Sequence, residues 1–210
     1  MSAEVVLYDY WRSSAAYRVR IALNLKGIAY RAVPIDLAQG EQGGAAYRAV
    51  NPQGLVPALA IDGELLTQSV AIIEYLDARF PDPPLLPADP IRRAHTQARA
   101  LVIAADIHPI ANLRVLNALR GDFGADEAAQ RGWIQRWIGA GFAALEAQAP
   151  QTGLWGGALP DLVDLCLVPQ MYNARRFAMP LDAFPQLVRI DAAMRGLPAV
   201  AAAAPEAVQN

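Results

Sequence analysis

The chain of 210 residues contains a single cysteine, Cys166, and only two histidines. One cysteine cannot form an internal disulfide, and it cannot supply a multi-cysteine metal site. The histidines, His95 and His108, are too far apart in sequence to suggest a metal site on their own, so we expect no bound metal. Cys166 lies in the apolar run 165–168, which indicates a buried and unreactive thiol.

Long apolar runs are also missing. None reaches the roughly 18 residues of a transmembrane helix, and the N-terminus lacks the pattern of a signal peptide. The net charge of −2 and the pI near 5.7 argue against nucleic acid or an anionic membrane as the main partner. We therefore expect a soluble cytoplasmic protein, with a sizeable core because 54% of its residues are hydrophobic.

The first third of the chain alternates between strand and helix patterns. A helix that stops at Gly27 connects two strand candidates, which predicts that they pair in parallel. Asp62-Gly63 is a strong hairpin signal between two further strands. The predicted strands are 5–10, 29–35, 55–61 and 64–66, and the predicted helices are 15–26, 45–50 and one that Ser69 caps and that reaches Phe80. The order is βαβαββα, a small mixed sheet with helices against it.

Residues 81–90 contain five prolines, which predicts a stiff linker without regular structure. We expect an α/β domain over residues 1–82, a linker over 83–90 and an all-helical domain over 91–210. The helical domain is expected to begin with one long helix over 91–119, kinked at Pro109.

Three more helices are predicted after this one, over 126–149, from Asp161 and over 185–194. Asp161 and Asp164 resemble a capping box, and Pro169 lies inside the helix that they begin. The residues from Ala201 are small and polar, so we expect this tail to fray.

Ser13 and Ser14 lie at the start of the first predicted helix, directly after Arg12. A helix N-terminus presents free backbone N–H groups and a partial positive charge, so it favours an anion. A serine in this place is often only a helix cap. The segment by itself leaves both interpretations open.

Several segments share the pattern of one known family. They are Ser13-Ser14-x-x-Tyr17-Arg18-Val19-Arg20, Asn51-Pro52 with Val56-Pro57, Gln68-Ser69, Ile107-His108-Pro109 and Leu167-Val168-Pro169-Gln170. With them the chain resembles the glutathione transferase superfamily, and within it the zeta class, which includes maleylacetoacetate and maleylpyruvate isomerases. The resemblance covers nearly the whole chain. It implies a thioredoxin-like N-terminal domain and an all-helical C-terminal domain.

The resemblance implies glutathione as cofactor and assigns residues to it. Ser13, or Ser14 as second choice, would donate a hydrogen bond to the glutathione thiolate. The backbone of Val56, before a cis Pro57, would pair with the cysteinyl part. Gln68 and Ser69 would bind the γ-glutamyl carboxylate, and Gln42 would bind the glycyl carboxylate. His108 and Asn112, which we expect to lie one helical turn apart on a shared face, would make further contacts with glutathione.

The implied activity is isomerisation of a maleyl dicarboxylate to its fumaryl isomer by reversible addition of the thiolate. Arg12, Arg114 and Arg176 are the candidates to bind the substrate carboxylates. The zeta pattern often has a cysteine after the serine pair, where this chain has Ala15, so disulfide exchange is disfavoured. The alternatives are a transferase that conjugates or dehalogenates small electrophiles, and a scaffold without activity. The resemblance also implies a homodimer.

Overall fold

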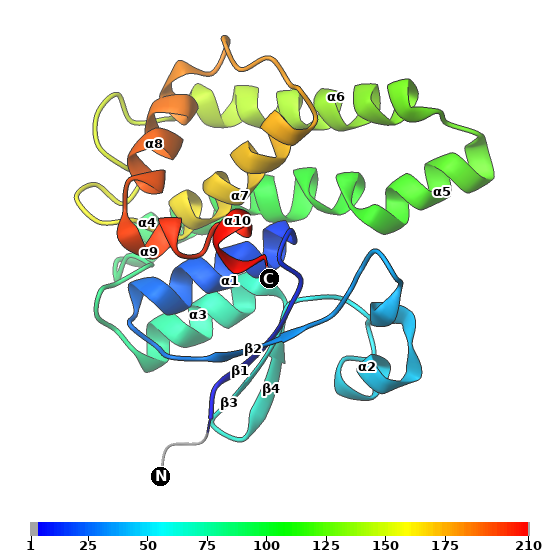
Figure 1. Ribbon diagram of the computed structural model, residues 1–210. Coiled ribbons are helices and arrows are strands. Elements are labelled where there is room, and N and C mark those ends of the chain that lie inside the picture. The colour runs from blue at the N-terminus through cyan, green and yellow to red at the C-terminus, as the bar shows by residue number, and fades with distance from the viewer. Residues whose placement is uncertain (1–3, 210) are drawn as a thin grey trace. The chain divides into compact units, whose positions relative to one another are not determined.

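The structure, a computed structural model, describes residues 4–209 (Figure 1). The chain divides into two compact units, the first formed by Met1–Leu85 with Gly196–Asn210 and the second by Leu86–Arg195. The boundary at residue 85 lies close to the expected linker, but the last fifteen residues belong to the first unit rather than to the helical one.

The first unit is built on a four-stranded mixed sheet with strand order β2-β1-β3-β4. Strand β1 (Val6–Asp9) pairs in parallel with β2 (Arg31–Pro34) and antiparallel with β3 (Ala58–Ile61). Strand β4 (Glu64–Thr67) pairs antiparallel with β3, after a turn in which Asp62 and Gly63 both have positive φ. A two-residue hairpin turn of type I′ requires a positive φ at both of its central residues. The predicted order βαβαββα is confirmed.

Helices α1 (Ser14–Leu25) and α3 (Ser69–Arg79) lie side by side against the sheet, and α2 (Ala45–Val50) lies apart from them (Figure 1). Helix α1 ends at Lys26, and Gly27 then takes the left-handed conformation with φ 64°. Every residue of α1 from Ala16 to Leu23 is buried, Arg18 and Arg20 included. The helix is therefore enclosed on several sides.

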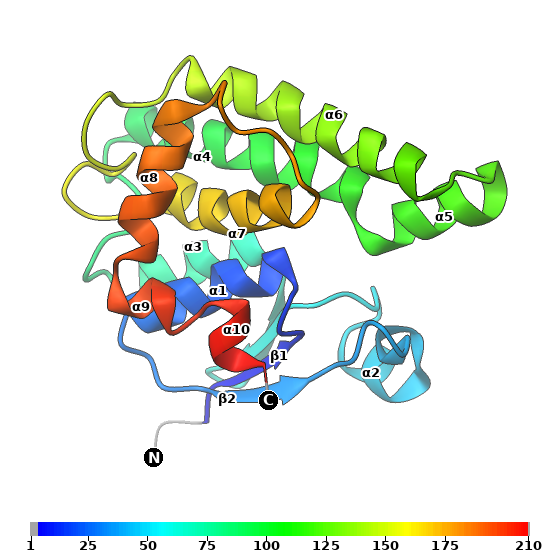
Figure 2. The ribbon, with the colours of Figure 1, turned by 45° about the horizontal axis from the view of Figure 1, so that its top comes forward.

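The C-terminal segment covers part of α1. It forms two short helices, α9 (Pro198–Ala201) and α10 (Pro205–Val208), of which α9 packs on α1 (Figure 2). Val200 and Ala203 are fully buried, and the Asn24 side-chain amide donates to the carbonyl of Ala199 at 3.0 Å. The prediction that this tail frays is wrong, because its small side chains let the backbone approach α1 closely and its carbonyls find donors there.

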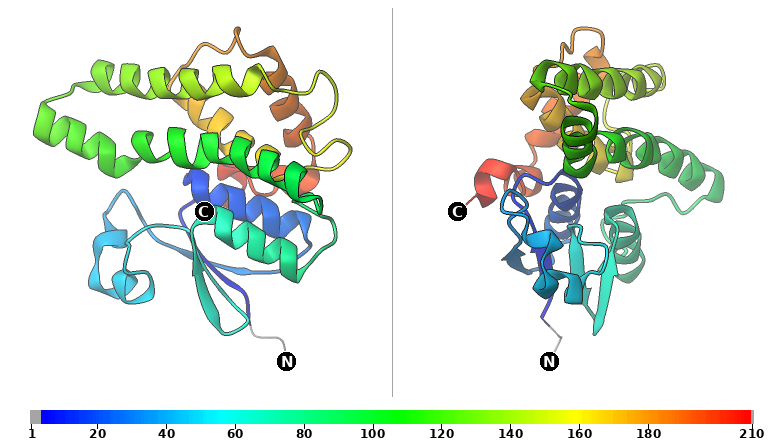
Figure 3. Two further views of the ribbon diagram at one scale, coloured as in Figure 1. Left: turned by 180° about the vertical axis from the view of Figure 1, so that it is seen from behind. Right: turned by 90° about the vertical axis from the view of Figure 1, so that its right-hand side faces the viewer.

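The second unit is built from helices, and Figure 3 shows α6 returning antiparallel to the stretch from α4 to α5. Its long helices are α4 (Pro90–Leu101), α5 (Leu113–Phe123), α6 (Glu127–Glu146), α7 (Leu162–Arg176) and α8 (Pro185–Arg195). The predicted single helix over 91–119, kinked at Pro109, is wrong, because this stretch is divided into two α-helices rather than bent. A π-helix η2 (Val102–Ile107) and a 3-10 turn η3 (Pro109–Ala111) separate α4 from α5. Pro109 has no N–H and cannot continue the α-helical ladder.

Helix α7 supplies much of the core of the second unit. Its residues from Leu162 to Met171 are all buried, with Cys166 and Pro169 among them. The helix begins with the predicted capping box, in which Asp161 accepts from the N–H of Asp164 and the Asp164 carboxylate accepts from that of Asp161. Within residues 4–209, no helix combines the length and the apolar character needed to span a bilayer.

Candidate active site

The loop from β1 to α1 contains Arg12, Ser13 and the start of the helix at Ser14. The N–H of Ser13 donates to the carbonyl of Tyr10 at 2.8 Å, which closes a tight turn. The Ser13 hydroxyl oxygen accepts from the N–H of Ala16 at 3.2 Å, so Ser13 is the helix N-cap. Its oxygen is engaged as an acceptor, and its hydrogen can still be donated to a ligand. Capping and ligand binding are therefore compatible at Ser13.

Arg12 lies in the middle of this turn and is half-buried. Its guanidinium carbon lies 5.0 Å from the ring centroid of Trp11, a cation–π contact that restricts the side chain. The structure therefore places a positive charge on the residue directly before Ser13.

Helix α3 supplies a second N-terminus in the same unit. Gln68, not Ser69, is its N-cap residue, and the Gln68 side chain makes no capping hydrogen bond. The expectation that Ser69 caps α3 is wrong, because Gln68 has φ 68° and turns the chain so that Ser69 becomes the first helical residue. The Gln68 amide nitrogen donates to Gln53 Oε1 at 3.2 Å.

Arg18 connects the two helix N-termini. It lies one turn along α1 from Ser14, and its Nη1 donates to the hydroxyl oxygen of Ser69 at 3.2 Å. Both residues are buried, Arg18 at 1% exposure and Ser69 at 6%. This side of the first unit therefore combines two sets of free helix N–H groups with a buried cation, which suits an anionic ligand.

The Val56–Pro57 peptide bond directly before β3 is cis, as predicted. The carbonyl of Leu55 accepts hydrogen bonds from the Tyr47 hydroxyl at 2.7 Å and from the Asn51 side-chain amide at 2.8 Å. Burial raises the pKa of Tyr47 to about 12, so this phenol remains a neutral donor. These two contacts fix the backbone that leads into Val56.

Gln42 lies in the 3-10 turn η1 (Glu41–Gly43). Among the described residues its Oε1 atom is buried and has no hydrogen-bond partner. The Gln42 carbonyl would lie 2.7 Å from a Cβ placed on Gly54, so only glycine allows this approach to the loop before Val56. A buried amide oxygen without a partner fits a peptide-like ligand. It could accept a hydrogen bond from a ligand N–H, and with the amide flipped the nitrogen could donate to a ligand carboxylate.

The remaining predicted residues belong to the second unit. His108 lies between η2 and η3, and Asn112 has extended backbone and caps α5 by accepting from the N–H of Val115 at 3.2 Å. The expectation that they share one helical face is wrong, because the helix is interrupted between them. Arg114 is exposed on α5, and Arg176 ends α7 with its guanidinium carbon 4.6 Å from the Phe177 ring centroid. Their functional roles stay predictions.

Comparison with known proteins decides the family. Residues 7–84 match the family described as glutathione S-transferase, N-terminal domain. The chain is 52% identical over 209 residues to maleylacetoacetate isomerase of Rhizobium meliloti, with 98% of each chain covered. A solved structure of a maleylpyruvate isomerase, described as a bacterial glutathione S-transferase in zeta class, superimposes with a TM-score of 0.95 at 46% identity, covering 98% of this chain and 99% of the other. This chain belongs to the zeta-class glutathione transferase family.

A second similar structure was solved with ligands in its active site. Maleylacetoacetate isomerase from Anaeromyxobacter dehalogenans, solved with dicarboxyethyl glutathione and citrate in its active site, is 40% identical. The two align with a TM-score of 0.87 over 99% of this chain and 93% of the other. The family membership confirms the predicted fold, a thioredoxin-like domain followed by helices.

Three buried charged residues of this zeta-class chain were not among the site residues predicted from its sequence, although two of them belong to the segment that carries the family resemblance. They are Asp9, Arg18 and Arg20, at 5%, 1% and 1% exposure. The sequence does contain a pattern that could have identified the two arginines. Arg18 and Arg20 alternate with apolar residues in a segment without other charges. Two arginines within a mostly apolar helical segment are expected to be buried with partners.

Proposed function

We propose that this protein is a glutathione-dependent cis–trans isomerase that converts a maleyl dicarboxylate into its fumaryl isomer. The observation that carries the proposal is Ser13, which presents a hydroxyl at the N-terminus of α1 while the only cysteine is buried in α7 of the other unit. The protein thus offers a site that stabilises a thiolate, and the ligand must bring the sulfur. The relatives named maleylacetoacetate and maleylpyruvate isomerase favour isomerisation over conjugation of electrophiles.

The first unit offers a partner for each part of glutathione. Ser13, with Ser14 as the alternative, donates to the thiolate, and the helix end lowers the thiol pKa further. Val56 pairs through its backbone with the cysteinyl residue, as an added strand would. The carboxylates are bound by Gln68 and Ser69 at the γ-glutamyl end and by Gln42 at the glycyl end. His108 and Asn112 are proposed as further contacts.

Bound glutathione supplies a sulfur nucleophile that adds reversibly to the maleyl double bond, permits rotation and leaves unchanged. The protein's own contribution is positioning and charge. Arg12, next to Ser13, binds a substrate carboxylate and stabilises the negative charge that develops as sulfur adds. Arg114 and Arg176 are proposed to bind the other carboxylate, because guanidinium groups grip carboxylates with two hydrogen bonds.

The decisive assay follows the absorbance of maleylacetoacetate and of maleylpyruvate with and without glutathione. We expect turnover of one or both only when glutathione is present, and a large loss for Ser13→Ala. Turnover without glutathione would refute the mechanism. If neither compound reacts but glutathione is consumed by small electrophiles, the protein is a conjugating transferase instead.

We also propose that the protein is a cytoplasmic homodimer, as the resemblance to the superfamily implies. Light scattering coupled to size exclusion should give twice the mass of the 22.6 kDa chain. A monomer mass at assay concentrations would refute the dimer without affecting the proposed chemistry.

A further inference from the structure

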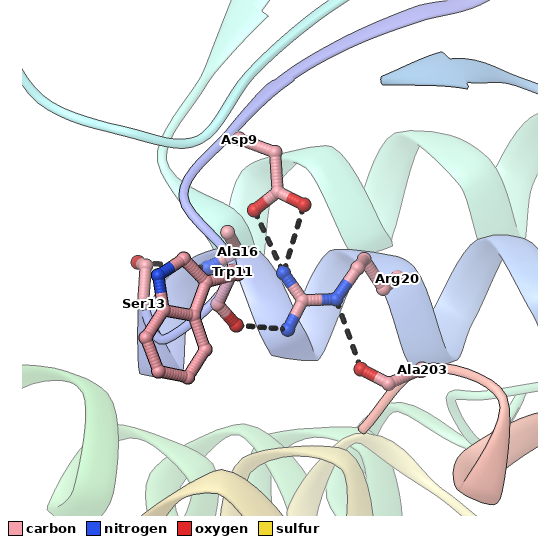
Figure 4. A network of polar contacts seen from close by, with 6 residues as sticks. All are labelled: Asp9, Trp11, Ser13, Ala16, Arg20 and Ala203. Atoms are coloured by element: carbon pink, nitrogen blue, oxygen red, sulfur yellow. Dashed lines mark hydrogen bonds and ion pairs between the residues drawn. The ribbon is translucent and has the colours of Figure 1, made fainter. Parts of the chain in front are cut away.

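The guanidinium of Arg20 is buried within the first unit and donates from each of its three nitrogens (Figure 4). Its Nη1 donates to both carboxylate oxygens of Asp9, at 2.7 and 2.8 Å. Its Nη2 donates to the carbonyl oxygen of Trp11 at 2.8 Å, and its Nε to that of Ala203 at 2.9 Å. Arg20 therefore joins the end of β1, the loop before α1 and the C-terminal segment.

The contact with Trp11 acts directly on the active-site loop. Trp11 and Arg12 share a planar peptide group, so fixing the Trp11 carbonyl also fixes the direction of the Arg12 N–H and the plane between the two residues. This peptide lies in the turn that the hydrogen bond from Ser13 to Tyr10 closes. One buried guanidinium thus contacts the backbone of the turn that contains Arg12 and Ser13.

We propose that Arg20 is a positioning residue, which orients Arg12 and Ser13 for catalysis by tying their loop to Asp9 and to the C-terminal segment. The planar fork of arginine reaches three acceptors in different directions, whereas a lysine ammonium on a flexible stem cannot reproduce that arrangement. The C-terminal segment takes part because the carbonyl of Ala203 satisfies the third nitrogen and Ala203 itself is fully buried.

The same helix offers a matched control. Lys26, the C-cap of α1, is also a buried cation that binds one carboxylate and two main-chain carbonyls. Its Nζ lies 2.8 Å from Asp77 Oδ1 and 2.6 Å from each of the carbonyl oxygens of Phe80 and Pro83. Lys26 therefore stabilises the start of the linker, and none of these contacts involves the loop of Arg12 and Ser13.

The positioning role can be tested first without any ligand. We compare hydrogen exchange in wild type, Arg20→Lys and Lys26→Met, all as full-length protein. Arg20→Lys should speed exchange in peptides covering residues 10–16 by about tenfold or more, with little change over 56–69. Lys26→Met should speed exchange over 80–86 and leave 10–16 unchanged. Equal protection of residues 10–16 in wild type and Arg20→Lys would overturn the proposal. Arg20→Met, which removes the charge, extends the series if it folds.

The catalytic readout rests on the proposed function. We expect Arg20→Lys to lower kcat about tenfold or more and to raise the pKa of the bound glutathione thiol by about one unit, measured by thiolate absorbance. At a pH below the pKa of the bound thiol, where the shift in that pKa does not affect binding, its Kd for glutathione should change less than about threefold, because the binding contacts at Val56, Gln68 and Ser69 lie outside the loop. Lys26→Met should retain wild-type values per folded molecule.

A purely structural role for Arg20 would leave kcat and the thiol pKa of folded Arg20→Lys at wild-type values, and that result would overturn the proposal. The proposed function fails separately, if the wild type shows no glutathione-dependent turnover. In that case the exchange comparison still decides whether Arg20 orders the loop.

Discussion

Arg18 donates a hydrogen bond from Nη1 to the hydroxyl oxygen of Ser69 at 3.2 Å, across 51 residues of sequence. Because this oxygen accepts from a cation, the hydroxyl hydrogen of Ser69 points elsewhere and is polarised for donation to an anion. The contact sets the direction of the Ser69 hydroxyl before any ligand arrives.

Ser69→Ala should therefore weaken glutathione binding about tenfold, which corresponds to about 1.4 kcal/mol. The variant loses a hydrogen bond to a charged group and leaves Arg18 with a methyl group in place of an acceptor. Isothermal titration calorimetry measures the change. Thr152→Ala, which removes an exposed hydroxyl from the second unit, is the control and should bind like the wild type. An unchanged Kd for Ser69→Ala would remove Ser69 from the site.

Gln68 has a positive φ of 68°, which is unfavourable for any residue except glycine. Gln68→Gly should raise the free energy of unfolding by about 1 kcal/mol because it relieves this strain. The same variant should weaken glutathione binding, since it removes the side chain proposed to contact the γ-glutamyl carboxylate.

Ala178→Gly is the matched control for Gln68→Gly, because Ala178 has φ 51° in the second unit. It should gain similar stability in thermal unfolding and keep wild-type affinity. If Gln68→Gly also keeps its affinity, the strain at Gln68 has no connection with binding.

Ser13 serves as N-cap and is proposed to contact the thiolate, and a glycine variant separates the two roles. Glycine caps a helix almost as well as serine, so Ser13→Gly should lose only a few tenths of a kcal/mol in stability. Without the hydroxyl, we expect the pKa of the bound thiol to rise by about one unit and the activity to fall about tenfold or more. Ser14→Ala should change the pKa of the thiol less. A larger effect at Ser14 would transfer the thiol contact to that residue.

Arg175 and Arg176 are neighbours with different expected roles. Arg176→Ala should raise the KM for the dicarboxylate about tenfold, leave glutathione affinity unchanged and cost little stability, because the side chain is exposed. Arg175→Ala should leave the KM for the dicarboxylate unchanged and should lower stability. Arg175 pairs with the fully buried Asp191 at 2.5 Å, so its removal should cost about 1 kcal/mol, with Arg195 still pairing. Equal KM values for the two variants would contradict the assignment of Arg176.

Stability should depend on the protonation of Asp164. Burial and the neighbouring carboxylate of Asp161 raise the pKa of Asp164 to about 7, against an ordinary value near 4. Between about pH 4 and 7 the folded state then binds more protons than the unfolded state, so this group makes stability fall as pH rises, by at most about 1.4 kcal/mol per pH unit.

Urea unfolding across this range, compared between wild type and Asp164→Asn, isolates the contribution of Asp164. The variant should show a flatter pH dependence. The opposite slope, with the wild type gaining stability relative to Asp164→Asn as pH rises, would mean that the N–H groups of Trp155, Gly156 and Asp161 keep this carboxylate ionised.

The features that could be predicted from the sequence are local ones. The element order, the hairpin at Asp62-Gly63 and the capping box at Asp161 each depend on residues close together in the chain, as does Ser13 as a helix cap. Periodicity, capping and turn preferences act over a few residues, so they can be read without knowing the fold. The glutathione site was predicted by resemblance to a family, since no local pattern distinguishes a binding serine from a capping one.

The sequence by itself determined the order of strands and helices, the hairpin turn at Asp62-Gly63 and the cap at Asp161, and it places no cysteine near Ser13 in the chain. Only the tertiary structure decided what surrounds α1. Arg20 bonds to Ala203 across 183 residues and Arg18 to Ser69 across 51, while the C-terminal segment that was expected to fray encloses the same helix. Burying a guanidinium is favourable only when all its partners arrive together, and those partners are distant in sequence. The folded chain is what brings them to the loop of Arg12 and Ser13.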